Sequence, residues 1–252
     1  MMRRLFYALI ILCFVLVIAI CGFVFYYYPA KLRPKNDYRD ASALLQSGEY
    51  VSAALKFESL GDYSDSAERA KNAWRAAADE SFDAGDFAKA RTYYLKAGQD
   101  ASVVEKLDAA YYQMGVKYYA ENERVEGENC FSCISSGSRY LALLDPVRIS
   151  CGERFLEEDD LESAEKVFSL CGEASRDDIA DIWLKKGSDL LLTGDTDGAG
   201  DCFAKAMAYT SDRDAMTRVT DNRWYAAGIA AGMAGDEELA EKCFARMSYS
   251  QH

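Results

Sequence analysis

The sequence predicts an all-α protein in which a single transmembrane helix precedes an α-solenoid of about six helix-turn-helix repeats. Three observations support this: a long uncharged apolar stretch, a turn signal that recurs at nearly constant spacing, and small and aromatic residues at fixed offsets from that signal. Periods of about 20 to 50 residues are typical of repeat architectures. We expect four regions, which are a basic tail at 1–4, a transmembrane helix at 5–28, a short basic linker at 29–36 and repeats over 37–252.

The apolar stretch, residues 5–28, reads LFYALIILCFVLVIAICGFVFYYY and contains no charged side chain. As a helix rising about 1.5 Å per residue it would extend about 36 Å, against about 30 Å of hydrocarbon in a bilayer. A cleaved signal has an apolar core of about 7 to 15 residues and small residues at its exit, whereas here the bulky Ile20 precedes Cys21. We therefore predict an uncleaved signal anchor in the lipid bilayer of the cell membrane, with Tyr26, Tyr27 and Tyr28 at the interface.

The charges beside the span bear on orientation. Four basic residues follow it, which slightly favours a cytoplasmic repeat domain, whereas Arg3 and Arg4 form a short basic tail of the kind that is usually retained inside. From the tail we expect the domain on the outer side. The basic run at Lys31, Arg33 and Lys35 is interpreted as a contact with lipid headgroups.

The region after residue 35 is strongly acidic. It holds all 41 acidic residues and 24 of the 29 basic ones, a net charge of −17 with histidine neutral. Such a field repels phosphate backbones, so we expect no nucleic-acid partner.

The recurring turn signal is a Gly, Asn or Asp, which we call the landmark of each unit. These residue types suit a turn that needs a positive φ or a local side-chain cap. The spacings are 37, 37, 37, 35 and 41 residues, between Gly48, Gly85, Asn122, Asp159, Gly194 and Gly235.

Small and aromatic residues recur at fixed offsets from the landmarks. Two helices approach closely only where one presents a small residue and a ring on the other fills the space beyond. Seven residues before the landmarks stand Ala41, Ala78, Gly115, Gly152, Gly187 and Gly228. Five residues after stand Ala53, Ala90, Gly127, Ala164, Ala199 and Ala240, and nine after stand Phe57, Tyr94, Phe131, Phe168, Phe203 and Phe244. We predict that these residues pack the two helices of each unit together.

This set of positions resembles the tetratricopeptide repeat, most clearly in WRAAADESFDAGDFAKARTYYLKAG and WYAAGIAAGMAGDEELAEKCFARM. The resemblance covers residues 37–250. Each step is about three residues longer than the roughly 34-residue family repeat. The proline that usually closes a unit is replaced by Asp65, Ser102, Arg139, Arg176 and Ser211. FESLGDYSDSAERAK is similar to segments of anchored repeat proteins of Gram-positive bacteria.

The resemblance implies that the first helix of each unit lines a concave groove. Residues ten, six and three before each landmark would then face a partner: Tyr38, Arg75, Asp79, Phe82, Tyr112, Val116, Tyr119, Glu153, Leu156, Leu191, Tyr225 and Ile229. Phe82, Tyr112 and Tyr119 would form an aromatic patch, although an aromatic stripe at helical spacing is equally typical of helix packing. Because Asp79, Val116 and Glu153 stand where carboxylate-clamping members have Asn, a clamp for a peptide C-terminus is not expected.

Catalysis is not expected. The one histidine, His252, is terminal, and Ser-His and Cys-His pairs both need a positioned imidazole. We expect no enzyme activity and no cofactor, and predict a membrane-tethered scaffold that binds a protein or peptide partner through its groove. A cell-wall glycan in an aromatic groove is an alternative.

A thiol or metal site at Cys130 and Cys133, completed by Cys151 and Cys171, is a second alternative because the first two form a C-x-x-C pair. However, Cys130, Cys202 and Cys243 all stand eight residues after a landmark. A position shared by three units favours packing, in which free cysteine acts as a small hydrophobe.

Overall fold

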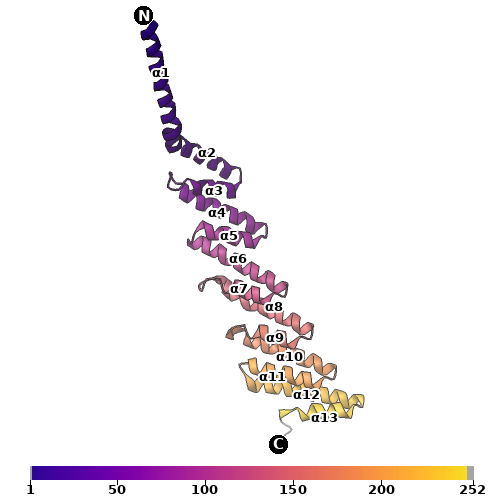
Figure 1. Cartoon of the computed structure of the whole chain (residues 1–252). Helices are drawn as coiled ribbons and strands as arrows, with labels where there is room; N and C mark the ends of the chain where they lie inside the picture. Colours follow the sequence, from indigo (N-terminus) through magenta and orange to yellow (C-terminus); the bar gives the residue numbers. More distant parts are fainter. Residues whose placement is uncertain (1, 249–252) are drawn as a thin grey trace. The chain divides into compact units, whose positions relative to one another are not determined.

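The computed structural model describes residues 2–248, and within that range every regular element is helical. Figure 1 labels the α-helices in chain order. Their bounds are α1 (Met2–Gly22), α2 (Arg33–Gln46), α3 (Tyr50–Ser59), α4 (Ser66–Asp83), α5 (Phe87–Ala97), α6 (Ala101–Ala120), α7 (Arg124–Phe131), α8 (Leu144–Glu157), α9 (Leu161–Phe168), α10 (Arg176–Leu192), α11 (Thr196–Tyr209), α12 (Arg213–Ala234) and α13 (Glu237–Ala245). A π-helix, η1 (Phe23–Leu32), and two 3₁₀ helices, η2 (Arg139–Leu143) and η3 (Glu173–Ser175), complete the set. The all-α prediction is confirmed.

Consecutive helices pack as neighbouring pairs. The pairs are α2 with α3, α4 with α5, α8 with α9, α10 with α11, and α12 with α13. The ring of Phe131 in α7 stacks on Tyr112 in α6 at a centroid distance of 6.2 Å, which joins the remaining pair. The chain divides into two compact units, one formed by residues up to 117 with 125–138 and the other by 118–124 with everything from 139 onward.

Each landmark residue lies in the left-handed region of the backbone, as its residue type suggested. The φ values are +83° at Gly48, +76° at Gly85, +63° at Asn122, +60° at Asp159, +82° at Gly194 and +83° at Gly235. The next residue caps the second helix of the pair in four units, since Asp86, Asp160, Asp195 and Asp236 each accept a hydrogen bond from the backbone N–H three residues later. A tight turn thus reverses the chain within each pair.

The small and aromatic positions meet inside the pairs. All twelve residues at the offsets of five and nine after the landmark are buried except Phe244, which is half-buried. The glycines seven before the landmark lie under the rings. A Cβ placed on Gly187 would come within 2.6 Å of the Phe203 ring, and one on Gly228 within 2.7 Å of the Phe244 ring. The absence of a side chain at these glycines is what allows the two helices to approach closely.

Aspartate side chains hold the loops that follow three of the second helices. Asp108 accepts a hydrogen bond from the backbone N–H of Ser135 at 3.0 Å, and Asp145 accepts one from Gly172 at 2.9 Å. Asp221 does the same with Ser248 at 2.9 Å. All three stand fourteen residues before a landmark. These hydrogen bonds fix the loop in three of the units, and the repeat pattern in the sequence did not indicate them.

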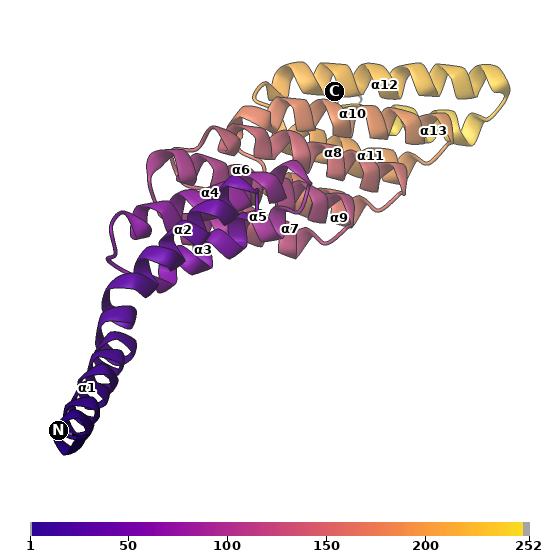
Figure 2. The ribbon, with the colours of Figure 1, turned by 90° about the horizontal axis from the view of Figure 1, so that it is seen from above.

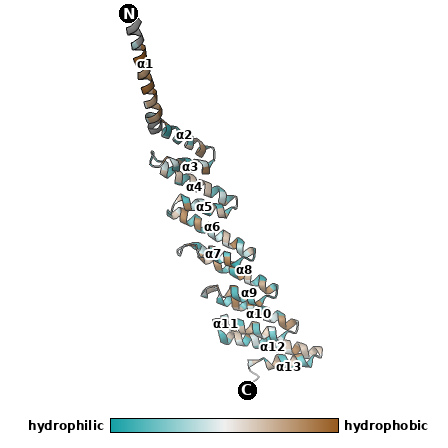
Figure 3. Cartoon of the chain, in the orientation of Figure 1, coloured by the Kyte–Doolittle hydropathy of each residue, from teal (hydrophilic) through white to brown (hydrophobic). Residues whose placement is uncertain are grey.

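The N-terminal helix is distinct from the rest. Leu9–Tyr28 is long and apolar enough to cross a membrane, and none of it is buried against the protein. Figure 3 shows this helix as an almost continuous hydrophobic segment, whereas the other helices alternate.

The predicted linker at 29–36 is helical. η1 continues through Pro29, and the backbone N–H of Arg33 donates to the carbonyl of Tyr28, five residues earlier. Because proline has no N–H to donate, the wider π-type pattern carries the helix across this position. α2 begins at Arg33, so the span leads into the first helix pair without a coil segment.

Candidate partner-binding surface

The first helices of three successive pairs, α8, α10 and α12, form one surface of the second compact unit. α10 contacts both α8 and α12, and the three follow one another side by side in Figure 2. We refer to the side of these helices that carries the two depressions described below as the first-helix surface.

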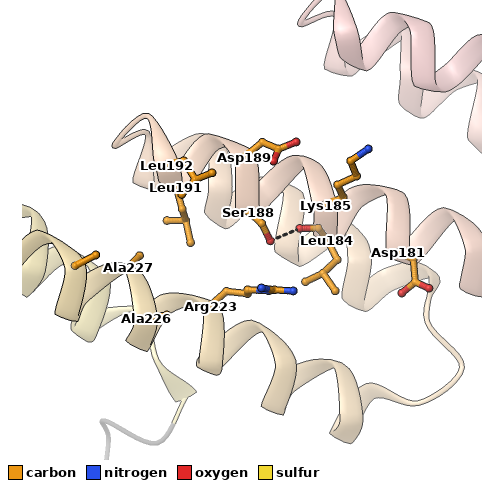
Figure 4. Close-up of a pocket in the computed structure, with 11 residues that line it drawn as sticks. Asp181, Leu184, Lys185, Ser188, Asp189, Leu191, Leu192, Arg223, Ala226 and Ala227 are labelled. Atoms are coloured by element: carbon orange, nitrogen blue, oxygen red, sulfur yellow. Dashed lines mark hydrogen bonds between the residues drawn. The ribbon is translucent and has the colours of Figure 1, made fainter.

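A groove with a volume of about 560 Å³ runs between α10 and α12. Its α12 wall is made of small residues, Ala226, Ala227 and Ala230, together with Arg223. Its α10 wall carries Asp181, Leu184, Lys185, Ser188, Asp189, Leu191 and Leu192. Figure 4 shows Leu184, Ser188 and Leu191 directed toward α12, whereas Lys185 and Asp189 point away from it. The space between the two helices therefore receives mainly apolar side chains together with that of Arg223, and Lys185 and Asp189 stand at its edge.

A smaller depression of about 170 Å³ lies between α8 and α10. It is lined by Glu153, Leu156, Glu157, Ile182 and Lys186, and it shares Lys185 and Asp189 with the groove. Since the same two side chains border both depressions, the first-helix surface is continuous from α8 to α12.

Two large apolar side chains stand almost fully exposed at the ends of α10 and α12. Leu192 is 87 % exposed and Met233 is 86 % exposed. Both stand two residues before a landmark, where the other units have Gln46, Asp83, Ala120 and Glu157. The surrounding stretch of α12, residues 224–235, contains no charged side chain. The repeat pattern did not single out these residues, although they are the only large apolar side chains at this position in the sequence.

The charged side chains that line the groove are unpaired. Within residues 2–248 no hydrogen bond or salt bridge engages the side chains of Asp181, Lys185, Asp189 and Arg223. Lys186, in contrast, is held by Asp159 at 2.5 Å and by the carbonyl of Leu156 at 2.8 Å. These four charged side chains are therefore free to meet a partner.

The residues projected onto a groove in units two and three are mostly engaged with their own chain. Arg75 forms an ion pair with Asp100. Asp79 accepts hydrogen bonds from the Tyr94 hydroxyl and the Lys106 ammonium, each at 2.6 Å. Phe82 packs edge-on against Phe87 at 5.1 Å, while Tyr112 and Val116 are half-buried.

Of the other residues projected onto a groove, Tyr119 and Leu156 are buried and Tyr225 lies outside the groove. Tyr119 is 2 % exposed and Leu156 is 5 % exposed, so the prediction that Tyr119 adds an accessible ring to an aromatic patch is wrong. Leu156 belongs to the smaller depression together with the exposed Glu153. Tyr225 is 53 % exposed but does not line the groove, because its ring lies 6.1 Å from Phe244 on the second helix of its pair. Leu191 is the projected residue that the groove contains.

The remaining two projected residues also lie outside the groove. Tyr38 donates a hydrogen bond to Asp65, and its ring packs on Phe57 at 5.6 Å. Ile229 is exposed on α12.

The three cysteines that share one position in the repeats are packed inside the protein. Cys130, Cys202 and Cys243 are buried, and burial raises the pKa of all three thiols, that of Cys202 to about 11. Cys133 is exposed. Among the described residues no group of three or more His, Cys, Asp and Glu side chains could hold a metal ion. His252 lies outside the described residues.

Comparisons with known proteins do not assign a family. No protein-family model matches the chain, and a search of curated proteins finds no significant relative. The tetratricopeptide resemblance therefore remains a proposal that rests on the repeated positions alone.

Proposed function

We propose that this chain is a membrane-tethered scaffold of tetratricopeptide-like repeats that binds a protein partner on its first-helix surface and catalyses no reaction. The observation that carries the proposal is the open apolar groove of about 560 Å³ between α10 and α12, bordered by the exposed Leu192. A contiguous exposed apolar surface rimmed by polar groups is typical of an interaction site.

The chemistry of the groove supports binding over catalysis. Ser188, the one hydroxyl among the lining residues, donates its hydrogen bond to the carbonyl of Leu184 in its own helix at 2.8 Å. No histidine lines the groove to activate it. The apolar side chains of the lining and its free charges suit recognition, in which a buried apolar centre supplies affinity and polar rim groups supply specificity.

The N-terminal helix supports the tether. It is long and apolar enough to span a bilayer and passes through η1 directly into α2. A single-pass anchor that runs into the first helix pair would keep the repeats at the membrane, so a partner would be recruited there.

A photo-cross-linking residue at Leu192 tests the proposal in native membranes. The matched control is the same substitution at Leu95 on α5, which is also a large exposed apolar residue but belongs to the other compact unit. We expect a discrete protein adduct at position 192 that is absent at position 95. Adducts at 192 that contain only cell-wall glycan, or equal labelling at both positions, would overturn the proposal.

The outer placement of the repeats, which rests on Arg3 and Arg4 before the span, has its own test. Protease added to intact cells should digest the domain. Protection until the cells are lysed would place it in the cytoplasm.

A further inference from the structure

We infer that the occupant of the groove between α10 and α12 is an amphipathic α-helix of a partner protein, with large apolar side chains along one stripe and Lys or Arg beside them. The inference rests on the proposed function and adds the chemistry of the partner. Three features of the groove carry it: the shape of its walls, the hydrogen-bonding groups that it offers, and the charge around it.

The walls have the spacing of helix packing. On α12, Ala230 lies four residues after Ala226 and three after Ala227, and on α10 the steps from Leu184 to Ser188 and from Ser188 to Leu191 are four and three residues. Helices pack at about 8 to 10 Å between axes, depending on the side chains at the contact. Methyl side chains on the α12 wall allow the closer end of that range. The apolar stripe of an incoming helix would then fill the 560 Å³ that the alanines leave open.

The last unit differs from units two to five at one wall position, where the first unit also carries an alanine, Ala43. Five residues before the landmark, units two to five carry the charged side chains Glu80, Lys117, Arg154 and Asp189, whereas the last unit carries Ala230. Together with the uncharged stretch 224–235, this leaves the C-terminal part of α12, beyond Arg223, without charge. A face without charge that lies open to water is unusual unless another element covers it.

The apolar part of the groove offers no free hydrogen-bonding group to the main chain of an extended peptide. Its lining has no Asn, Gln, Thr or Tyr side chain, and the Ser188 hydroxyl is already used within α10. An extended peptide buried here would leave backbone N–H groups unsatisfied against the apolar side chains, which is costly. A helix satisfies its own backbone groups and needs only apolar contact, so the groove selects a helix over an extended segment.

The charge of this part of the chain predicts that the partner helix is basic. From Arg139 onward the chain has 13 basic and 23 acidic residues, a net charge of −10. Asp181 and Asp189 line the groove unpaired, with Glu153 and Glu157 beyond them on α8. This field attracts a basic helix and repels both a second copy of the chain and an anionic membrane surface. Lys185 and Arg223 can pair with isolated carboxylates on such a helix.

The test uses the full-length protein in nanodiscs of phosphatidylcholine and measures the binding of labelled synthetic peptides by fluorescence anisotropy. The probe is a helix of about 18 residues, five turns, with Leu at positions i, i+3, i+4 and i+7 and Lys elsewhere. Three comparison peptides replace Lys by Glu, scramble the Leu positions, or add central prolines that prevent a helix. Empty nanodiscs give the background from lipid.

Two double variants separate docking from general electrostatic attraction. Ala226→Glu with Ala230→Glu places two carboxylates in the groove, and Ala204→Glu with Ala208→Glu adds the same charge at exposed alanines four residues apart on α11. We expect the groove variant to weaken binding of the Leu/Lys helix about tenfold or more, equivalent to about 1.4 kcal/mol, because it buries carboxylates against apolar side chains. The α11 variant should not weaken it. Circular dichroism verifies that both variants keep their helix content.

Several outcomes would overturn the inference. If both variants bind the cationic peptide more tightly, the attraction is general and no helix docks in the groove. Equal binding of the Glu, scrambled or proline peptide would refute the stated partner chemistry. A dimer in light scattering that the groove variant dissociates would assign the groove to a second copy, and lipid adducts at position 192 would assign it to the membrane. A protein cross-link at Leu192 without binding of the Leu/Lys helix would retain the proposed function and reject the inference.

Discussion

Gly187→Ala should destabilise the α10–α11 pair, although the same substitution usually strengthens a helix. Gly187 lies in α10 opposite the buried ring of Phe203 in α11. A Cβ at this position would lie 2.6 Å and 2.7 Å from two ring carbons and 3.2 Å from the carbonyl oxygen of Ala199. The ring is enclosed by the core and the carbonyl belongs to the backbone of a helix, so neither can move aside without loss of packing.

The magnitude follows from two opposing terms. Overpacking a filled core costs about 1 to 3 kcal/mol, whereas replacing Gly by Ala inside a helix gains about 0.5 to 1 kcal/mol. Because both a ring and a backbone atom are too close, we expect the upper part of the overpacking range and a net loss of about 2 kcal/mol.

Gly232→Ala is the matched control for this prediction. Gly232 is an exposed glycine in α12 whose added Cβ would meet only the Ala240 Cβ, at 3.9 Å, which is ordinary contact. Gly232→Ala should therefore increase the free energy of unfolding only by the higher helix propensity of Ala over Gly, about 0.5 to 1 kcal/mol. The difference between the two variants isolates the cost of the contact with Phe203.

The assay is thermal denaturation of the full-length protein in detergent, with amide hydrogen exchange of each helix. At about 2 to 4 °C per kcal/mol for a chain of this size, Gly187→Ala should lower the unfolding temperature and Gly232→Ala should raise it. Exchange should accelerate most in α10 and α11, because stability in repeat arrays is approximately a sum of local and neighbour terms. If Gly187→Ala is as stable as Gly232→Ala, the close-approach argument for the glycines is wrong.

Three further predictions follow from the loops, caps and thiols. Asp108→Ala should cost about 1 to 3 kcal/mol, because it leaves the backbone N–H of Ser135 without its acceptor, and urea unfolding measures the loss. Hydrogen bonds from Ser163 hold the pKa of Asp160 below its ordinary value, so the cap stabilises the fold above about pH 4 and weakens as the pH falls through the lowered value. Asp160→Asn should therefore flatten the acid limb of a stability-against-pH profile, and an unchanged limb would contradict this. Iodoacetamide at about pH 8 should label Cys133 and spare Cys202, whose pKa of about 11 leaves it protonated, as peptide mass spectrometry would verify.

The local parts of this fold could be predicted from the sequence because they depend on residues close together in the chain. The residue types of Gly48 and Asp159 predict a turn with a positive φ. That turn places the residue seven before it opposite the residue nine after it. The pairing of Gly187 with Phe203 follows from that spacing alone. The apolar N-terminal helix is equally local, since its length and lack of charge need no partner.

Only part of the candidate site, including Leu191, could be predicted in the same way. The tetratricopeptide resemblance selected Tyr119 and Tyr225 as groove residues. Tyr119 is buried, and the ring of Tyr225 lies against Phe244 within its own helix pair. Whether a side chain on a first helix is covered depends on the spacing of neighbouring first helices, and that spacing is set by side chains about 40 residues apart in the chain. The hydrogen bond that Ser248 donates to Asp221 also joins residues that only the folded unit brings together.

By itself, therefore, the sequence determined an apolar span, a series of helix pairs and the residues that pack each pair, because these follow from composition and short-range periodicity. The tertiary structure alone decided that the open surface lies between α10 and α12. There Ala226, Ala227 and Ala230 are too small to fill the space beside Leu184 and Leu191, and an apolar groove is left exposed to solvent.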